Sequence, residues 1–499
     1  MASIASAFDG SAVAGSLICQ FTAPSAHNLI LNKVTHLEVY SFSEEGESPV
    51  LQERIPINGK ISLFQSFRAG TSPTDLLLLT TEKYDFCILR YSSSHNTKSQ
   101  GSIATVASGN LNKICGKQND LGQMGGIDQS HKAFIVHFLQ GIIKVVPIAK
   151  AASDKDILFK ESFDVRIQEL NIIALSILHD KPLLFGIIWQ DVHRRRHFKT
   201  YQVNLTKECV EDANCSFGEC DASAKLLLAV PKPVGGALIV GERSILYKSF
   251  DSSVLFPLQP AFCFQTATLI PSSGGLRWLL GDSEGKLFLL CLVLDSKKQQ
   301  VVALEMEFLA STSVIASCIS YIDDGVIFLG SAVGDSQLAR LLRERDECGN
   351  MLEYLQPYTG LAPIHDFHLV KEGGSFCKSV IACCGSRIQG SIRAIRLGAA
   401  IQRESVLDIR GMAFKRIWTL KTSNKHEFHS HILVSSIGTS RLFFLGEEGV
   451  EEVEICGFSP EQEETLLATN LLNQDLILHV TNNYIRLLYC FANSLESSQ

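Results

Sequence analysis

The amino-acid sequence predicts an all-β protein built from β-propeller blades. Three observations lead to this prediction: hairpins recur along the chain, the first strand of each hairpin is almost uniformly apolar, and helical patterning is weak. Ten hairpins start about 40 to 60 residues apart, which is the spacing of one propeller blade each. Their first residues are Asn28, Leu76, Ala133, Leu183, Gly236, Arg277, Gly325, Ser379, His431 and Asp475.

Each hairpin pairs an apolar first strand with a second strand in which apolar and polar residues alternate more clearly. A strand covered by neighbouring blades on both faces needs apolar side chains throughout, as in residues 76–79. The turns contain Gly-Asp, Gly-Glu, Asn-Asn and Gly-Ser pairs, which supply the positive φ angles of tight hairpins. Residues 459–472 fit either a helix or a further strand, and the pattern leaves both open.

Two other repeat architectures fit the pattern less well. Sandwich strands follow one another at about 8 to 12 residues without a longer period. Helical repeats would show a period of about 3.6 residues, whereas these stretches are rich in Val, Ile, Phe and Thr. A propeller ring leaves only short, protected strand edges. The Gly-His and Trp-Asp signature of WD repeats is missing, so the sequence indicates a divergent propeller without WD motifs.

Composition limits the class of protein. The chain is 46% hydrophobic and 19% charged, which excludes a largely disordered protein. Its net charge of -7 argues against a general basic coat for nucleic acid. The first residues do not form a secretory signal, and no apolar run approaches the roughly 18 residues of a membrane span. With 15 cysteines placed mostly singly in apolar stretches, we expect a soluble protein in a reducing compartment.

No catalytic, cofactor-binding or metal-binding residue is predicted. The chain contains no G-x-S-x-G elbow, P-loop, G-x-G-x-x-G after a strand, or H-E-x-x-H. Cys209, Cys215 and Cys220 are the best metal candidates, but their spacings do not match the C-x₂-C pairs of zinc sites. We therefore expect residues 207–221 to form a polar loop.

Two clusters of basic or histidine residues have ordinary explanations. Residues 193–197 (His-Arg-Arg-Arg-His) fit a phosphate-binding or nuclear-import patch, but a solvated hairpin turn is favoured, because five residues make few phosphate contacts. His426, His429 and His431 lie before a strand without a thiol or carboxylate spaced to join them. Loop composition explains them better than a metal site does.

Several longer stretches carry a family resemblance. They read FDVRIQELNII from Phe163, AVPKPVGGALIVGERSILY from Ala229, RWLLGDSEGKLFLL from Arg277, TSVIASCISYIDDGVIFLGSAVGDSQLARL from Thr312 and GSIRAIRLGAAIQ from Gly390. Together they resemble the N-terminal part of the DNA damage-binding protein 1 family, the large adaptors of cullin-4 ubiquitin ligases. Paralogous families serve the splicing factor 3b complex and the cleavage and polyadenylation machinery.

The resemblance implies three seven-bladed propellers followed by a helical domain, of which this chain holds the beginning. We expect an N-terminal segment over residues 1–16, the first propeller over 17–396 and the start of a second, incomplete propeller over 397–499. A ring cannot close with two blades, which favours a fragment or mis-predicted gene product over a shortened isoform. Eight hairpins precede Arg396 where seven blades are expected, so one of them shares a blade or belongs to the junction.

The resemblance also implies a set of partner-binding residues. Receptors of the family contact the loop written here as residues 321–335 and the loop around residues 362–366. Ala332 stands where the family has an arginine, and residues 113–118 replace a basic stretch of the family. The implied partner-binding residues are Tyr321, Ala332, Val333, Asp335, Pro363, Ile364 and Asp366.

The implied function is that of a non-enzymatic scaffold. It would present WD-repeat substrate receptors to a cullin-4 RING ligase in the DNA damage response, in the nucleus and also in the cytoplasm. Cullin-4 would bind mainly to the missing part of the second propeller, and damaged DNA would be reached only through a partner subunit. No membrane partner is expected. A scaffold of an RNA-processing complex is the alternative, and a propeller enzyme is a third class.

Overall fold

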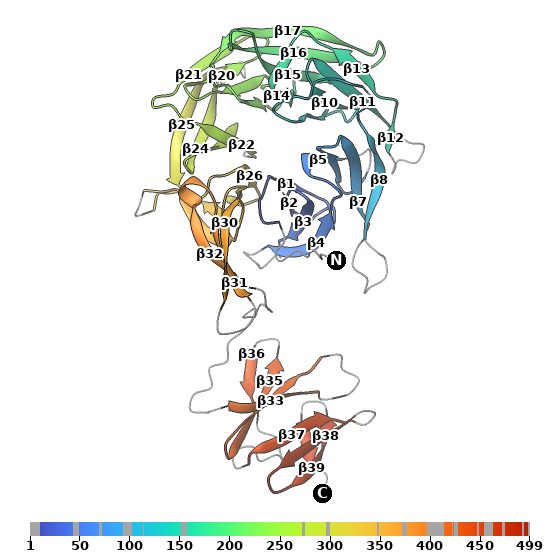
Figure 1. Ribbon diagram of the computed structural model, residues 1–499, viewed down its shortest axis with the longest axis vertical. Coiled ribbons are helices and arrows are strands. Elements are labelled where there is room, and N and C mark those ends of the chain that lie inside the picture. The colour runs from blue at the N-terminus through green and yellow to red at the C-terminus, as the bar shows by residue number, and fades with distance from the viewer. Residues whose placement is uncertain are drawn as a thin grey trace. The chain divides into compact units, whose positions relative to one another are not determined.

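The computed structural model contains two compact units, Met1–Leu397 and Gly398–Gln499, which are considered separately (Figure 1). The described residues are 10–42, 49–68, 72–92, 102–112, 114–150, 157–271, 275–295, 300–346, 349–371, 377–396, 414–421, 423, 428–446, 449–453, 463–471, 475–491 and 494–497. In this part of the chain the regular structure is β-strand apart from one 3-10 turn, η1 (Arg387–Gln389), which confirms the predicted all-β class. None of these residues belongs to a helix long and apolar enough to cross a bilayer.

Unit 1 begins with antiparallel sheets that follow one another along the chain. The first two contain β1 (Gly15–Cys19), β2 (Asn28–Asn32), β3 (His36–Ser41), β4 (Val50–Pro56), β5 (Ile61–Phe67), β6 (Leu76–Thr81), β7 (Asp85–Ser92) and β8 (Ser102–Asn110). The third and fourth contain β9 (Met124–Ile127), β10 (Ala133–Leu139), β11 (Ile142–Lys150), β12 (Ile157–Phe159), β13 (Phe163–Arg166), β14 (Asn171–Ile177), β15 (Leu184–Gln190), β16 (Arg196–Asn204) and β17 (Cys209–Cys220).

The remaining sheets of unit 1 follow the same plan until the last, which has only three strands. The fifth, sixth and seventh contain β18 (Leu226–Ala229), β19 (Ala237–Val240), β20 (Ser244–Lys248), β21 (Ser253–Pro257), β22 (Phe264–Ile270), β23 (Arg277–Asp282), β24 (Lys286–Leu294), β25 (Val301–Ser311), β26 (Cys318–Tyr321), β27 (Val326–Gly330), β28 (Ser336–Leu341) and β29 (Leu352–Tyr358). The eighth contains β30 (Ile364–Lys371), β31 (Cys377–Cys384) and β32 (Ser391–Arg396).

The first seven sheets are the blades of a closed ring. Their first strands contact one another in cyclic order, β1 to β5, β9, β14, β18, β22 and β26, and β26 contacts β1 again. Figure 1 shows β1 and β26 near each other although they lie at opposite ends of this ring in the sequence. The seven-bladed propeller is therefore confirmed. The eighth hairpin that precedes Arg396 lies in the sheet β30–β32, which follows the ring and adds no blade to it.

The blade strands are apolar because each packs against two neighbouring blades. All six residues of β6 are buried. Leu76 and Leu78 belong to the core shared with β10 of the third blade, whereas Leu77 and Leu79 belong to the core shared with the first blade. Since side chains alternate between the two faces of a strand, one run of leucines serves two cores.

The ring closes between the first and seventh blades. Leu29 and Leu31 of β2 pack in one buried cluster with Phe328 of β27. At the same joint the hydroxyl oxygens of Ser16 and Ser320 lie 2.7 Å apart, and each hydroxyl is able to donate to the other. Residues more than 300 positions apart in the sequence therefore complete the core.

The expected polar loop over residues 207–221 is wrong. Cys209–Cys220 form β17, the outer strand of the fourth blade, which pairs with β16. The register shifts twice along this pair, as at β-bulges, and all three acidic residues of the strand face solvent. Residues 459–472, for which helix and strand were both open, include the strand β37 (Thr465–Asn470).

Unit 2 contains two four-stranded sheets. Their strands are β33 (Phe414–Leu420), β34 (His431–Ser436), β35 (Thr439–Gly446), β36 (Gly449–Glu452), β37, β38 (Leu476–Thr481), β39 (Ile485–Phe491) and β40 (Ser494–Ser497). The first strands of the two sheets, β33 and β37, contact each other as neighbouring blades do. The sheets share an apolar cluster that includes Leu433, Leu442 and Ile477.

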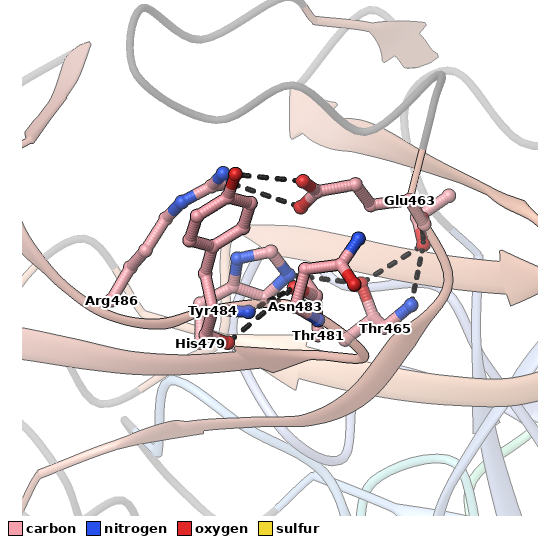
Figure 2. Close-up of polar contacts among 8 residues, drawn as sticks. Glu463, Thr465, His479, Thr481, Asn483, Tyr484 and Arg486 are labelled. Carbon is pink, nitrogen blue, oxygen red and sulfur yellow. Dashed lines mark hydrogen bonds and ion pairs between the residues drawn. The ribbon is translucent and has the colours of Figure 1, made fainter.

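A buried polar network also joins the two sheets of unit 2. Figure 2 shows the part of it around Thr465, His479 and Arg486. The backbone N–H of Thr465 donates to the hydroxyl of Ser440 in the first sheet at 3.0 Å. The hydroxyl of Thr465 lies 2.9 Å from Nε2 of His479, which is buried in the second sheet. Beside it Arg486 forms an ion pair with Glu463 at 3.2 Å and lies over the ring of Tyr484. Burial is the main cause that lowers the pKa of His479 to about 4, and the positive charge of Arg486 lowers it further.

We expect Phe328→Ala to lower the free energy of unfolding by about 3–5 kcal/mol, because it empties a fully buried site where the ring closes. Urea denaturation of the whole chain, followed by tryptophan fluorescence, measures the change. Leu255→Ala is the control, since Leu255 is 61% exposed on an outer strand and its removal should change stability by less than about 0.5 kcal/mol. Equal losses in the two variants would contradict a special role for the joint.

We expect unit 2 to lose about 3 kcal/mol of local stability between pH 7 and pH 4 through His479. A histidine whose folded pKa is lowered from 6.5 to about 4 takes up its proton more readily when unfolded, so stability falls as the pH drops through this window. Hydrogen exchange of peptides from β37 and β38, corrected for the intrinsic rate, measures it. His479→Gln should remove this part of the pH dependence, and an unchanged profile in that variant would contradict the assignment.

Candidate partner-binding face

Six of the residues implied by the family resemblance lie together at one end of the ring. Ala332, Val333 and Asp335 are in the turn between β27 and β28, and Pro363, Ile364 and Asp366 lie at the start of β30. The two segments are joined by backbone hydrogen bonds that run through residues 385 and 386 to Pro363 and Val333. We call the surface formed by residues 331–335, 360–366 and 385–393 the partner face.

Tyr321 does not belong to the partner face. It ends β26, and the following strand β27 carries the chain to the opposite end of the antiparallel blade before the turn at residues 331–335 begins. The hydroxyl of Tyr321 accepts a hydrogen bond from the N–H of Gly325 at that far end. The expectation of one loop over residues 321–335 is therefore wrong, because a buried strand occupies its middle.

Gln389 holds the partner face together. Its Oε1 accepts hydrogen bonds from the N–H of Ile315 at 3.0 Å and from the hydroxyl of Ser331 at 2.8 Å, and its Nε2 donates to the carbonyl of Asp335 at 2.8 Å. Gly334 packs so closely against Gln389 that a Cβ atom there would lie 2.6 Å from the glutamine side chain. The 3-10 turn η1 is thus attached to the seventh blade by side-chain hydrogen bonds rather than by strand pairing.

The carboxylate of Asp335 is committed to contacts within the chain. One oxygen forms an ion pair with Arg393 at 2.7 Å, and the other accepts the N–H of Gly360 at 2.7 Å. Asp366 is more open, since its carboxylate accepts only the N–H of the next residue among the described contacts and the residue is exposed. Ile364 is 49% exposed, so Ile364 and Asp366 are the accessible apolar and charged residues of the set.

A cavity of about 350 Å³ opens at the partner face beside η1. Its lining includes Ser283, Ser317, Val333, Ser386 and Arg387. The volume is near the lower end of the roughly 300–1,000 Å³ of ligand pockets and suits an inserted side chain. Hydroxyl and guanidinium groups line it without a pair of neighbouring nucleophile and base, and the described residues include no group of three His, Cys, Asp or Glu that could hold a metal ion.

The sheet β30–β32 adds apolar area that the sequence did not predict. Phe367 and Leu369 of β30 are 62% and 53% exposed, and Ile381 of β31 and Ile392 of β32 are 40% and 78% exposed. Pairing places Phe367 opposite Ala382 and Cys383 opposite Ile392, so the exposed residues lie on both faces of the sheet. The hairpin from Ser379 was visible in the sequence, but its position outside the ring was not.

Residues 193–195 lie in the solvated turn that was favoured, between β15 and β16, whereas Arg196 and His197 begin β16 and are half-buried. Asp191 organises it by accepting the N–H groups of His193 and Arg195 and by pairing with the side chains of Arg195 and His197. Burial alone would raise the pKa of Asp191, but these hydrogen bonds lower it to about 2. Of the three arginines, Arg195 is therefore the one whose charge is neutralised by Asp191. Arg196 donates to the carbonyl of Ala224 instead.

The other sequence candidates do not assemble into a site. Of the stretch 113–118, Lys113 lies outside the described residues and Cys115 is exposed. His426 also lies outside them, and His431 is buried in β34, where its ring packs against Phe444. The cysteines of β17 are free thiols, and burial raises the pKa of Cys220 to about 12, which keeps this thiol protonated.

Comparison with known proteins agrees with this architecture. A family model described as the RSE1/DDB1/CPSF1 first beta-propeller matches residues 12–362. The chain belongs to this family. The model of the same family's second beta-propeller matches residues 405–496, which lie in unit 2.

Individual members of the family are similar along almost the whole chain. DNA damage-binding protein 1 of Oryza sativa subsp. japonica is 34% identical over 496 residues, which are 99% of this chain and 44% of the relative. DNA damage-binding protein 1b of Arabidopsis thaliana is 34% identical and DNA damage-binding protein 1 of Solanum lycopersicum is 32% identical, each over 97% of this chain and 43% of the relative. The chain thus spans less than half the length of these relatives.

We expect Gln389→Ala to loosen η1 and β30–β32 from the seventh blade by about 1–3 kcal/mol, since it leaves buried partners unsatisfied. Hydrogen exchange of residues 377–396 should speed up while exchange within the ring stays unchanged. Gln52→Ala, which removes the same group from an exposed position on β4, is the control. Slow exchange of residues 377–396 in Gln389→Ala would show that other contacts hold the sheet.

Proposed function

We propose that this chain acts as a non-enzymatic scaffold that presents WD-repeat substrate receptors to a cullin-4 RING ubiquitin ligase in the DNA damage response. The observation that carries the proposal is the membership of the family together with relatives named DNA damage-binding protein 1 over almost the whole chain. The named relatives are longer, so the ligase, the receptors and the repair role are proposed for this chain by analogy.

The partner face supports the receptor part of the proposal. It combines an accessible apolar residue, Ile364, with an accessible carboxylate, Asp366, on a platform held by Gln389. Interfaces gain most of their affinity from a few apolar anchors surrounded by polar groups, and rigid platforms lose little entropy when they bind. Because Ala332 carries no charge and Asp335 is paired with Arg393, we assign the electrostatic part of recognition to Asp366.

The other partners follow from the same proposal. Cullin-4 would bind mainly through second-propeller sequence that is not among these 499 residues. Damaged DNA would be reached only through a partner subunit, since the chain carries a net charge of -7 and Asp191 pairs with part of its basic turn. We place the protein in the nucleus and also in the cytoplasm, where such ligases would meet their substrates.

A scaffold of an RNA-processing complex is the alternative, because the matching family model covers the RSE1 and CPSF1 branches as well. This branch would associate with splicing factor 3b or with cleavage and polyadenylation proteins. Affinity purification of the tagged chain, followed by identification of the bound proteins, separates the two. Recovery of cullin-4 and WD-repeat receptors supports the first proposal, and recovery of RNA-processing subunits overturns it.

We expect Asp366→Lys combined with Pro363→Glu to weaken receptor binding at least tenfold, because it reverses the accessible charge and puts a charge beside Ile364. A tenfold loss corresponds to about 1.4 kcal/mol. Co-purification with a WD-repeat receptor and titration by anisotropy measure it.

The matched control is Asp251→Lys with Pro257→Glu, which makes the same changes at exposed positions of the fifth blade. This control should bind the receptor as the unchanged chain does. If the partner-face variant is folded, as judged by its melting temperature, and still binds fully, the site assignment is wrong.

A further inference from the structure

A second surface lies at the end of the ring opposite the partner face. A groove of about 810 Å³ runs between the sixth and seventh blades, and Tyr321 lies in its wall. Its apolar floor includes Leu309, which is buried, and Leu289 and Met351, which pack partly against the same cluster. The volume falls within the upper part of the range of about 300–1,000 Å³ seen for ligand pockets. We call it the arginine groove after its lining residues Arg277, Arg340 and Arg343.

The groove exists because the two blades separate at this end. Along β23 and β24, Leu279 pairs with Leu289, and in the interior Leu279 is fully buried against the seventh blade. Arg277 lies two residues before Leu279, on the same face of β23 and at the end of the strand. An exposed, charged side chain therefore stands there instead of an apolar one. Since no apolar side chain closes the gap there, the floor remains accessible beneath charged groups.

The positive charge at the rim is only partly neutralised. Glu307, which lies on the same face of the sixth blade, forms an ion pair with Arg345 at 2.8 Å. Arg340 lies 4.0 Å from Glu353. Within the described part of the chain, no carboxylate lies at ion-pair distance from Arg277 or Arg343, and both are exposed. Asp324 is the acidic residue of the lining, against three arginines.

We propose that the arginine groove binds a short peptide segment of a partner protein in which aliphatic side chains are flanked by carboxylates. The aliphatic side chains would cover Leu289, Leu309 and Met351, and the carboxylates would meet Arg277 and Arg343. Guanidinium groups form paired hydrogen bonds with carboxylates, and the apolar floor strengthens them by excluding water. The excess of positive charge in a protein of net charge -7 sets this groove apart from its surroundings.

A nucleic acid fits the groove less well. Single strands are held by aromatic platforms on which successive bases stack, together with many phosphate contacts. The lining of the groove contains one aromatic side chain, Tyr321, and its hydroxyl is used by the backbone of Gly325. An aliphatic floor suits leucine or isoleucine side chains better than bases.

The test uses the full chain and three fluorescein-labelled peptides of equal length, measured by anisotropy. One carries a Leu-Leu pair between glutamates, one carries the same pair between lysines, and one carries Ser-Ser between glutamates. We expect the first to bind at least tenfold more tightly than the other two. Arg277→Glu with Arg343→Glu should weaken its binding at least tenfold and strengthen that of the lysine peptide, because both changed residues are exposed and line the groove.

Arg194→Glu is the matched control, since Arg194 is exposed in a turn of the fourth blade. It should leave the affinity within twofold. If the double variant does not fold, Arg343→Gln replaces it with an expected loss of at least threefold. No saturation by the acidic leucine peptide at millimolar protein, equal binding of the serine peptide, or unchanged binding in the folded variants would overturn the proposal.

Labelled oligothymidylate that binds more tightly than the peptides, and is released by the same charge reversals, would overturn it in favour of nucleic acid. The partner face lies at the other end of the blade, so receptor binding by the groove variants separates this proposal from the proposed function. Loss of peptide binding with receptor binding retained supports two independent surfaces.

Discussion

The structure of unit 1 depends on one constraint, which is that every blade must be covered on both faces. A twisted sheet made of residues such as those of β6 is apolar on each side, so it is stable only between two neighbours. In a row of such sheets, every blade is covered on both faces only when the first and last blades pack against each other. The cluster of Leu29, Leu31 and Phe328 and the hydrogen bond between Ser16 and Ser320 make that joint. The apolar composition of the whole unit follows from this requirement.

Closure of the ring also determines where recognition can occur. The inner strands of the blades are buried, so the surfaces left for partners are the ends of the ring, the outer edges of the blades and any sheet outside the ring. At one end, Gln389 attaches η1 to the seventh blade and places Ile364 and Asp366 beside it. At the other end, the sixth and seventh blades separate and expose a floor of apolar residues under three arginines. The two surfaces share a blade but differ in charge, which permits different partners.

Unit 2 uses the same kind of sheet with a different joint. Between its two sheets, the contact of Ser440, Thr465 and His479 supplements the apolar cluster with buried hydrogen bonds. Buried polar groups are costly unless each has a partner, so this network favours one register of the two sheets over others. The lowered pKa of His479 is a consequence of that burial, and it links the joint to pH.

The sequence by itself determined the all-β class, the blade-sized repeat and the absence of WD motifs. This was possible because the buried first strand of each hairpin is a short apolar run that can be recognised locally. The sequence also favoured a turn at the basic run, which the structure shows at residues 193–195, since five residues make few phosphate contacts. It did not determine that residues 209–220 form an edge strand, because a polar strand that faces solvent has the composition of a loop.

Only the tertiary structure decided which distant residues meet. Tyr321 and Asp335 are 14 positions apart, yet β27 places them at opposite ends of a blade, whereas Asp335 meets Arg393 across 58 positions. The separation of the sixth and seventh blades, and the place of β30–β32 outside the ring, likewise depend on closure. Closure is a contact between the two ends of a long chain segment, and such contacts leave no local pattern in the sequence.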